Sequence, residues 1–228
     1  MKRIFCVLII LCLAFSIVFA GGRSDRNANR LVLGVTEFEP MNFRDARGNW
    51  TGFDTEFALL VGERLGMRVE FQLIEWANKF IELDSRAIDA IWNGFTATAN
   101  EPDGTPRINL CDMSYSYMLN SQAVVVRAER ARDFRTTADL TGRTLAVEAG
   151  SAGETKGRGL VGDYNDLVVA DIDLGYEVYA IGFRRGDTLR DRVNQAMLEL
   201  YNEGRLREIA RKYGLEDRLV IDTNFGRR

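Results

Sequence analysis

The order of apolar and polar residues in the first half of the chain predicts strands that alternate with helices. Gly66 is a typical helix end signal, because it directly follows a run with apolar residues at helical spacing. A hairpin with its tip at 45–49 is expected before that helix. This alternation indicates an α/β lobe with a parallel sheet. Strands are expected at 31–35, 68–76 and 88–95, and helices at 54–65 and 78–87.

The second half of the chain continues with strand-like sequence and ends in two helices. A polar connector at 133–142 separates the first two apolar runs of this half. Strands are expected at 121–129, 143–150 and 176–187, and helices at 188–202 and 205–213, the last closed by Gly214.

The first thirty residues are expected to lie outside the folded part. Residues 1–20 combine Lys2 and Arg3 with a long apolar run, which is typical of an export signal. The alternative is a membrane anchor, because the apolar run approaches the length of a bilayer span. The basic start and early position favour a cleaved signal and therefore a periplasmic, extracytoplasmic protein. Residues 21–30, "GGRSDRNANR", are expected to form a disordered leader.

Composition narrows the classes of function. Once the signal with Lys2 and Arg3 is removed, 28 basic residues face 33 acidic ones, a balance that gives no basic surface for nucleic acid. The chain has no histidine, which excludes Ser-His and Cys-His nucleophiles and zinc sites that contain histidine. Cys6 and Cys12 belong to the signal, so Cys111 cannot form an internal disulfide.

The loops after the strands of the first lobe carry the candidate binding residues. In open α/β sheets, ligands bind beyond the carboxyl ends of strands. Phe38 follows the first strand, Trp76 follows the second, and Asn93, Gly94 and Thr96 follow the third. Two aromatic rings can enclose a small ligand, glycine lets the backbone approach it, and threonine offers a hydroxyl. The alternative is that both aromatic side chains are ordinary core residues.

A glycine-rich turn begins at Gly150, in the stretch "GSAGETKG". The backbone N–H groups of such a turn attract an anion. The stretch lacks the Gly-Lys-Ser/Thr ending of a phosphate-binding loop, so a nucleotide phosphate is not the expected anion.

Four stretches of the chain resemble the extracytoplasmic solute-binding proteins of the polar amino-acid ABC transporter family. The resemblance covers most of the chain after the signal and implies an α/β, two-lobe clamshell fold that closes on one small amino acid. It also implies delivery of the ligand to the permease subunits of an ABC importer, with no cofactor and no catalysis. The four stretches are "PMNFRDARGNWTGFDTEFALLVGERLG", "IEWANKFIELDSRAIDAIWNGFTAT", "DLTGRTLAVEAGSAGE" and "YAIGFRRGDTLRDRVNQAMLELYNEGRLREIARKYG".

The resemblance also implies a division of the chain and a set of ligand contacts. Lobe 1 would comprise 31–112 and 180–228, and 113–179 would hold the crossing segments and lobe 2. Phe38 and Trp76 match positions that flank the ligand side chain. Gly94 and Thr96 match positions that bind its ammonium group. Its carboxylate would meet the lobe 2 turn Gly150-Ser151-Ala152.

Three departures from the family pattern change this expectation. The arginine that usually pairs with the ligand carboxylate is replaced by Glu101, and Arg107 either takes over that role or is a solvated loop residue. Val35 stands where an acidic residue often accompanies basic ligands, which argues against lysine or arginine. After Gly150-Ser151-Ala152, the chain passes from "TKGRGL" to "LVVADIDLGYEVYAIGF", and a βαβα unit of lobe 2 is missing, together with its acid for the ligand ammonium.

These departures leave two functions open besides ordinary capture of an amino acid. One is a degenerate or dimer-dependent receptor-like module with a sensory or partner-binding role, since a truncated lobe 2 exposes a sheet edge. The other is a dehydratase, because a few proteins with this fold are dehydratases. The absence of histidine and the shortened lobe 2 argue against an enzyme.

Overall fold

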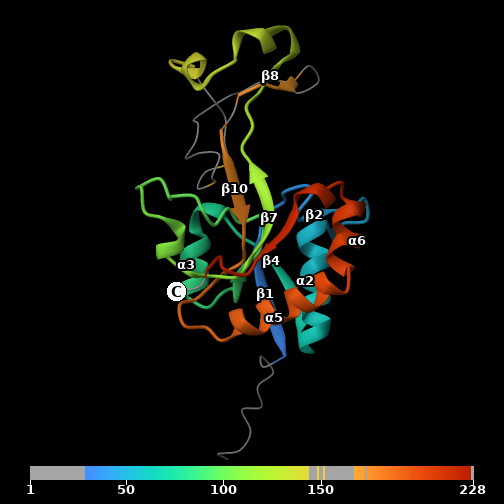
Figure 1. The fold of residues 1–228 in the computed structure, drawn as a ribbon. Coiled ribbons are helices and arrows are strands. Elements are labelled where there is room, and N and C mark those ends of the chain that lie inside the picture. The colour runs from blue at the N-terminus through green and yellow to red at the C-terminus, as the bar shows by residue number, and fades with distance from the viewer. Residues whose placement is uncertain (1–28, 144–147, 149–150, 152–166, 173, 227–228) are drawn as a thin grey trace, which may run out of the picture. The chain divides into compact units, whose positions relative to one another are not determined.

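The computed structural model describes residues 29–143, 148, 151, 167–172 and 174–226 (Figure 1). The expected signal, nearly all of the leader and most of the strand expected at 143–150 lie outside these residues. Among the described residues, none of the helices has the length and apolar character needed to cross a membrane.

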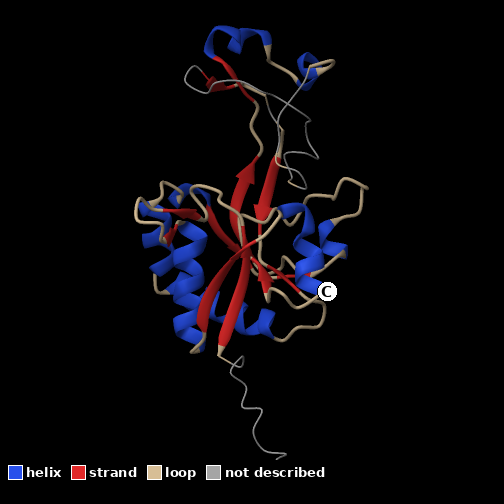
Figure 2. Ribbon diagram, turned by 180° about the vertical axis from the view of Figure 1, so that it is seen from behind, coloured by secondary structure: helices blue, strands red, loops and turns tan. Residues whose placement is uncertain are grey.

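A five-stranded mixed sheet forms the centre of the larger part of the molecule (Figures 1 and 2). The adjacent strands β1 and β5 are parallel, as the sequence predicts. The strand β11, from the second half of the chain, runs antiparallel to both of its neighbours, because the chain re-enters the sheet from the opposite end. The strand order is β4 (Arg68–Leu73), β1 (Arg30–Val35), β5 (Ala90–Ile91), β11 (Gly182–Phe183) and β6 (Asp112–Met113).

Helices flank this sheet and bury two apolar clusters. The helices α2 (Phe53–Leu65), α5 (Leu189–Asn202) and α6 (Arg205–Lys212) pack together over one cluster, and α3 (Lys79–Asp84) packs on the other (Figure 1). All four helices agree with the sequence prediction to within a few residues. Gly66 has the left-handed conformation (φ +66°) expected of a residue that ends a helix.

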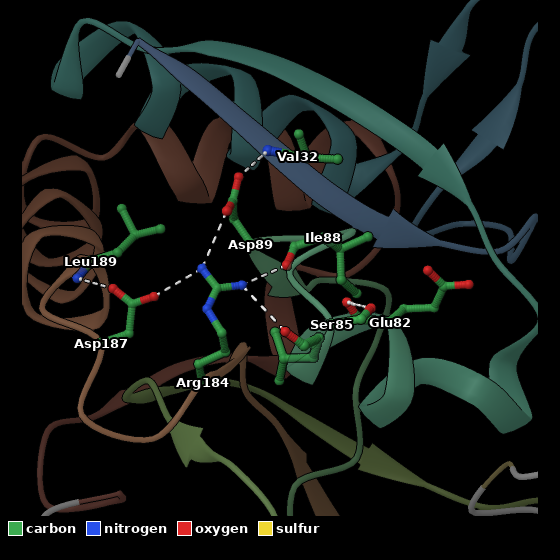
Figure 3. A network of polar contacts seen from close by, with 9 residues as sticks. Val32, Glu82, Ser85, Ile88, Asp89, Arg184, Asp187 and Leu189 are labelled. Atoms are coloured by element: carbon green, nitrogen blue, oxygen red, sulfur yellow. Dashed lines mark hydrogen bonds and ion pairs between the residues drawn. The ribbon is translucent and has the colours of Figure 1, made fainter. Parts of the chain in front are cut away.

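A polar network closes the end of the sheet where β1 and β5 begin (Figure 3). The guanidinium of Arg184 donates to the Asp89 carboxylate (3.2 Å) and to the Asp187 carboxylate (3.0 Å). Asp89 accepts a further hydrogen bond from Val32 N in β1 (2.9 Å), and Asp187 accepts one from Leu189 N at the start of α5 (3.0 Å). One arginine therefore ties together segments far apart in sequence at the edge opposite the candidate binding loops.

Two crossing strands connect the larger part with the residues beyond it. The strands β7 (Ser116–Ser121) and β10 (Tyr176–Tyr179) are antiparallel, with Met118 opposite Tyr179. The strand β12 (Leu219–Asp222) pairs with the other edge of β7, which makes a three-stranded sheet. The hairpin expected around 45–49 is present as β2 (Phe43–Arg44) and β3 (Trp50–Thr51).

A small separate cluster is formed by residues that lie between the two crossing strands in sequence. The strands β8 (Val125–Arg127) and β9 (Leu167–Val169) are antiparallel, and the short helices η3 (Ala128–Asp133) and η4 (Thr137–Leu140) follow β8. The strand expected at 121–129 is shorter than predicted. The core of this cluster consists of Val126, Phe134, Ala170 and Ile172.

Phe57 of α2 is expected to carry a large share of the stability of the larger core. Its fully buried ring lies 4.9 Å from the Trp92 ring and 5.6 Å from the Tyr117 ring between centroids. Phe57→Ala should lower the free energy of unfolding in urea by about 3–5 kcal/mol, because it leaves a cavity. Leu59→Ala on the same helix is the control, since Leu59 is 47% exposed and should cost about 0.5 kcal/mol. Equal losses would contradict this assignment of the core.

Candidate functional site

Phe38, Gly94 and Tyr179 meet beyond the carboxyl ends of β1 and β5. Gly94 has φ of +53°, and a Cβ added there would lie 2.8 Å from Phe38 Cε1 and 3.2 Å from Tyr179 Cε2. The backbone of Gly94 therefore lies directly against two aromatic rings, where glycine alone avoids both the clash and the left-handed strain. Phe38 is 41% exposed, so one of these rings is open to solvent.

The two aromatic residues singled out in the sequence have different surroundings. Trp76 is 6% exposed, and its ring lies edge-to-face against Phe95, with 6.0 Å between centroids. Trp76 belongs to the same apolar cluster as Phe95 and is therefore a core residue. Phe38 is not a core residue, because its side chain is exposed beside Gly94.

Asn93 ties the loop after β1 to the loop after β5. Its Nδ2 donates to the Thr36 carbonyl (3.0 Å), and its Oδ1 accepts from the Thr36 hydroxyl (2.7 Å). The Asn93 side chain is buried, so its polar atoms act inside the protein. These bonds hold the loop of Phe38 and the loop of Gly94 next to each other.

Thr96 is fixed between a crossing strand and a buried arginine. It forms a β-bridge with Tyr179, and its carbonyl accepts a hydrogen bond from Arg107 Nη1 (3.2 Å). Arg107 is buried, and its Nε donates to Glu101 Oε1 (2.7 Å). Arg107 is therefore not a solvated loop residue.

Glu101 bridges two buried cations. Its Oε2 accepts from Lys79 Nζ (3.0 Å), and its Oε1 accepts from Arg107. The Lys79 ammonium also lies 4.9 Å from the centre of the Phe80 ring, and the Arg107 guanidinium lies 5.2 Å from the Phe95 ring. Burial lowers the pKa of Lys79 and of Arg107, and Glu101 opposes both changes. This cluster of two cations and one anion lies beside Thr96.

Asp54 is a buried carboxylate on the other side of the same segment. Its Oδ2 accepts from Gly94 N (2.6 Å) and from the Tyr117 hydroxyl (3.0 Å). Burial raises the pKa of Asp54 to about 7, although both hydrogen bonds and the nearby Trp92 indole act in the opposite direction. Burial also raises the pKa of Tyr117, with the charge of Asp54 acting in the same direction.

Sequence analysis did not identify Asp54, Lys79 or Tyr179 as part of this site. Asp54 and Lys79 both stand at the start of a helix, where a charged residue usually faces solvent. Tyr179 is within an apolar strand and could have been found only from its pairing with Thr96. The sequence did indicate the loops of this site, through the glycine and aromatic residues around each loop.

The lobe 2 turn is only partly described. Ser151 N donates to the Glu148 carbonyl (3.1 Å), and the Ser151 side chain is half-buried. Gly150 and Ala152 lie outside the described residues. Within the described ranges, no group of three or more metal-ligating side chains could hold a metal ion.

Glu101→Gln should destabilise the protein by about 3 kcal/mol, because Lys79 and Arg107 lose the carboxylate that they share in a buried setting. Urea unfolding followed by circular dichroism measures this loss. The matched control is Glu216→Gln, which removes the same kind of partner from Arg211 at an exposed position and should leave the midpoint nearly unchanged. A control variant as destabilised as Glu101→Gln would contradict the argument.

Asp54 should make the protein less stable as the pH rises from about 4 to 7. Its folded-state pKa of about 7 exceeds the usual 3.8, so the folded protein binds this proton more tightly than the unfolded chain, and the stabilisation is lost as the proton leaves. The difference corresponds to about 4 kcal/mol at most. Urea unfolding at several pH values should show this decline in the wild type and a flatter profile in Asp54→Asn. Parallel profiles would show that Asp54 titrates at its usual pH.

Comparisons with known proteins identify the family of this chain. Residues 31–216 match the family model of the bacterial extracellular solute-binding proteins, family 3. The arginine-binding extracellular protein ArtP of Bacillus subtilis is 24% identical over 259 aligned positions, which cover 93% of this chain and 98% of ArtP. The L-cystine-binding protein TcyA of Bacillus subtilis is 28% identical, with 79% of each chain covered.

A solved structure extends the likeness to three dimensions. It is an ABC uptake transporter substrate binding protein from Streptococcus pneumoniae with bound histidine, which is 29% identical, with a TM-score of 0.70. The match covers 81% of this chain and 92% of that one. The expected two-lobe clamshell architecture of a periplasmic binding protein is therefore confirmed. Together, the matched residues, the fold and the loop positions show that the chain belongs to family 3 of the bacterial extracellular solute-binding proteins.

Proposed function

We propose that this protein binds one small amino acid outside the cytoplasm and delivers it to the permease subunits of an ABC importer. The observation that carries the proposal is the Gly94 turn, which lies beyond β5 with its backbone against Phe38 and Tyr179. Such a turn presents backbone groups to a ligand beside an exposed aromatic ring. The export signal expected at 1–20 would bring the protein to the compartment where this function is needed.

The charges around residues 94–96 suit a ligand that carries both an ammonium and a carboxylate. The Asp54 carboxylate lies under Gly94, and the Lys79–Glu101–Arg107 cluster lies beside Thr96. A free amino acid has groups of both signs a few bonds apart. Complementary charges of this kind give a binding site its orientation and specificity.

In this proposal, the predicted ligand contacts divide into two kinds. Phe38, Gly94 and Thr96 face or frame the ligand, with Phe38 against its side chain. Asn93 and Arg107 act from behind, because their polar atoms hold Thr36 and the Thr96 carbonyl. Trp76 supports Phe95 from the core, and the Gly150-Ser151-Ala152 turn is assigned to the ligand carboxylate on the strength of the family resemblance.

The names of the relatives indicate which ligands to try first. ArtP is named for arginine, TcyA for L-cystine, and the Streptococcus pneumoniae protein holds histidine. Val35 argues against arginine and lysine for this chain. The twenty amino acids together with L-cystine therefore form the appropriate ligand set.

A thermal-shift screen of the purified protein against this set tests the proposal. A ligand present at about 100 times its Kd stabilises a protein by about 2.7 kcal/mol. For a chain of this size, that raises Tm by about 5–10 °C. One or a few amino acids should produce such a shift. A flat response to the whole set would reject amino-acid capture.

Gly94→Ala should abolish the shift given by the best ligand. The added methyl group meets Phe38 Cε1 at 2.8 Å and forces the turn to move. Gly104→Ala is the matched control, because Gly104 also has positive φ (+87°) but has no atom within 4 Å of an added Cβ. It should keep the ligand response even if the protein is slightly destabilised. Loss of the response in both variants would show that the effect is not local to the site.

A second candidate is a receptor-like module that binds weakly or works as a dimer. The ArtP alignment extends over 259 positions, whereas the whole chain has 228 residues, so this chain lacks residues that ArtP has. The family resemblance assigns this loss to lobe 2. Tyr176 on β10 is 79% exposed, which is unusual for so large a ring on a strand. A flat thermal-shift screen combined with a dimer in light scattering would favour this candidate over amino-acid capture.

A further inference from the structure

Asp54 is connected to three elements that meet at the candidate site. It lies in the first turn of α2, and the same carboxylate oxygen accepts from Gly94 N after β5 (2.6 Å) and from the Tyr117 hydroxyl on β7 (3.0 Å). The other oxygen, Oδ1, is buried, and the Trp92 indole lies near enough to the carboxylate to help lower its pKa. The carboxylate thus serves as an acceptor for the ligand turn and for a crossing strand at once.

The bond to Gly94 holds that residue in its unusual conformation. Gly94 has φ of +53°, and its Cα faces the rings of Phe38 and Tyr179. Tyr117 and Tyr179 are themselves neighbours, with 6.4 Å between ring centroids. The position of the Gly94 turn and the packing of both crossing strands therefore depend on one carboxylate.

A neutral acceptor could make the same hydrogen bonds at lower cost. Burial of a carboxylate is expensive unless a cation or several donors compensate it. No lysine or arginine within the described ranges pairs with Asp54. Its compensation comes from the N–H of Gly94, the hydroxyl of Tyr117 and the indole of Trp92. What the carboxylate adds is a negative charge under the turn assigned to the ligand ammonium.

We propose that Asp54 is a positioning residue that holds the Gly94 turn in its binding conformation, and that its negative charge favours a ligand with an ammonium group. The part of this proposal that concerns the ligand rests on the function proposed above. The part that concerns the Gly94 turn does not. Asp54 does not touch the ligand. It acts through Gly94, and through Tyr117 it joins the turn to β7.

The titration of Asp54 gives the proposal a measurable signature. The titratable groups that face it are Tyr117 from β7 and Tyr179 from β10, and burial raises the pKa of both phenols, so they stay neutral below pH 9. The pKa of Asp54 itself is raised by burial to about 7. A change between pH 6 and 8 at this position therefore reports on Asp54.

The first experiment needs no ligand. The Asn-Gly dipeptide occurs once in the chain, at Asn93-Gly94, so a sample with ¹³C-carbonyl asparagine and ¹⁵N glycine shows the Gly94 amide alone. In the wild-type protein, this amide resonance should shift with pH, with a midpoint near 7. Asp54→Asn should abolish the titration. Glu56→Gln, also in the first turn of α2, is the matched control and should leave it unchanged.

Tyr117→Phe keeps the proposal falsifiable if Asp54→Asn does not fold. Removing the Tyr117 hydroxyl takes a hydrogen bond from the charged form of Asp54, so the Gly94 midpoint should move to higher pH. A Gly94 amide that is constant from pH 5.5 to 8.5, or that titrates equally in the wild type, Asp54→Asn and Tyr117→Phe, would overturn the positioning role.

A second experiment tests the effect of the charge on binding. The probe is the amino acid with the largest thermal shift among those, such as L-glutamine, whose α-ammonium and side chain do not titrate between pH 6 and 8. Calorimetric titration should give binding about tenfold weaker at pH 6 than at pH 8 in the wild type, and equal at both in Asp54→Asn. A measurable affinity with no pH dependence would reject the role of the charge. Absence of binding by any of these amino acids counts against the proposed amino-acid capture, while the Gly94 titration still decides the positioning role.

Discussion

The parallel pairing of β1 with β5 is the constraint on which the candidate site depends. Leu33 lies opposite Ala90 and Gly34 opposite Ile91, so both strands end at the same edge of the sheet. The loops that follow must then lie side by side, and the Asn93 side chain bonds them together through Thr36. Everything else in the site is added to this pair of loops: Tyr179 from a crossing strand, Asp54 from a helix and the Lys79–Glu101–Arg107 cluster from the next loop.

The elements that depend on local sequence could be predicted well. The apolar spacing of α2 and the glycine after it define that helix, and the hairpin around 45–49 follows from its turn residues. The strand β12 was missed, because its short apolar run has meaning only through β7, about a hundred residues earlier in the chain. The direction of β11 was missed for a similar reason, since it is decided by the route of the chain and not by its residues.

The sequence indicated residues at the strand ends, but not the residues that support them. Glycine and aromatic residues after strands drew attention to Phe38, Trp76 and Gly94, of which Trp76 lies in the core. Asp54 and Lys79 did not stand out, because a charged residue at the start of a helix is ordinary in solution and its burial depends on tertiary packing. The sequence shows that Glu101 stands where the family usually has an arginine. It does not show that Lys79 and Arg107 are the partners of Glu101.

The burial of Cys111 determines how its thiol would react in an oxidising compartment. Cys111 is buried against the same apolar cluster as Trp76, and burial raises the pKa of its thiol to about 12. A thiol that stays protonated and inaccessible does not attack disulfides, because the thiolate is the reactive form. In the extracytoplasmic setting proposed above, copies of this protein would therefore not become covalently linked to one another through Cys111.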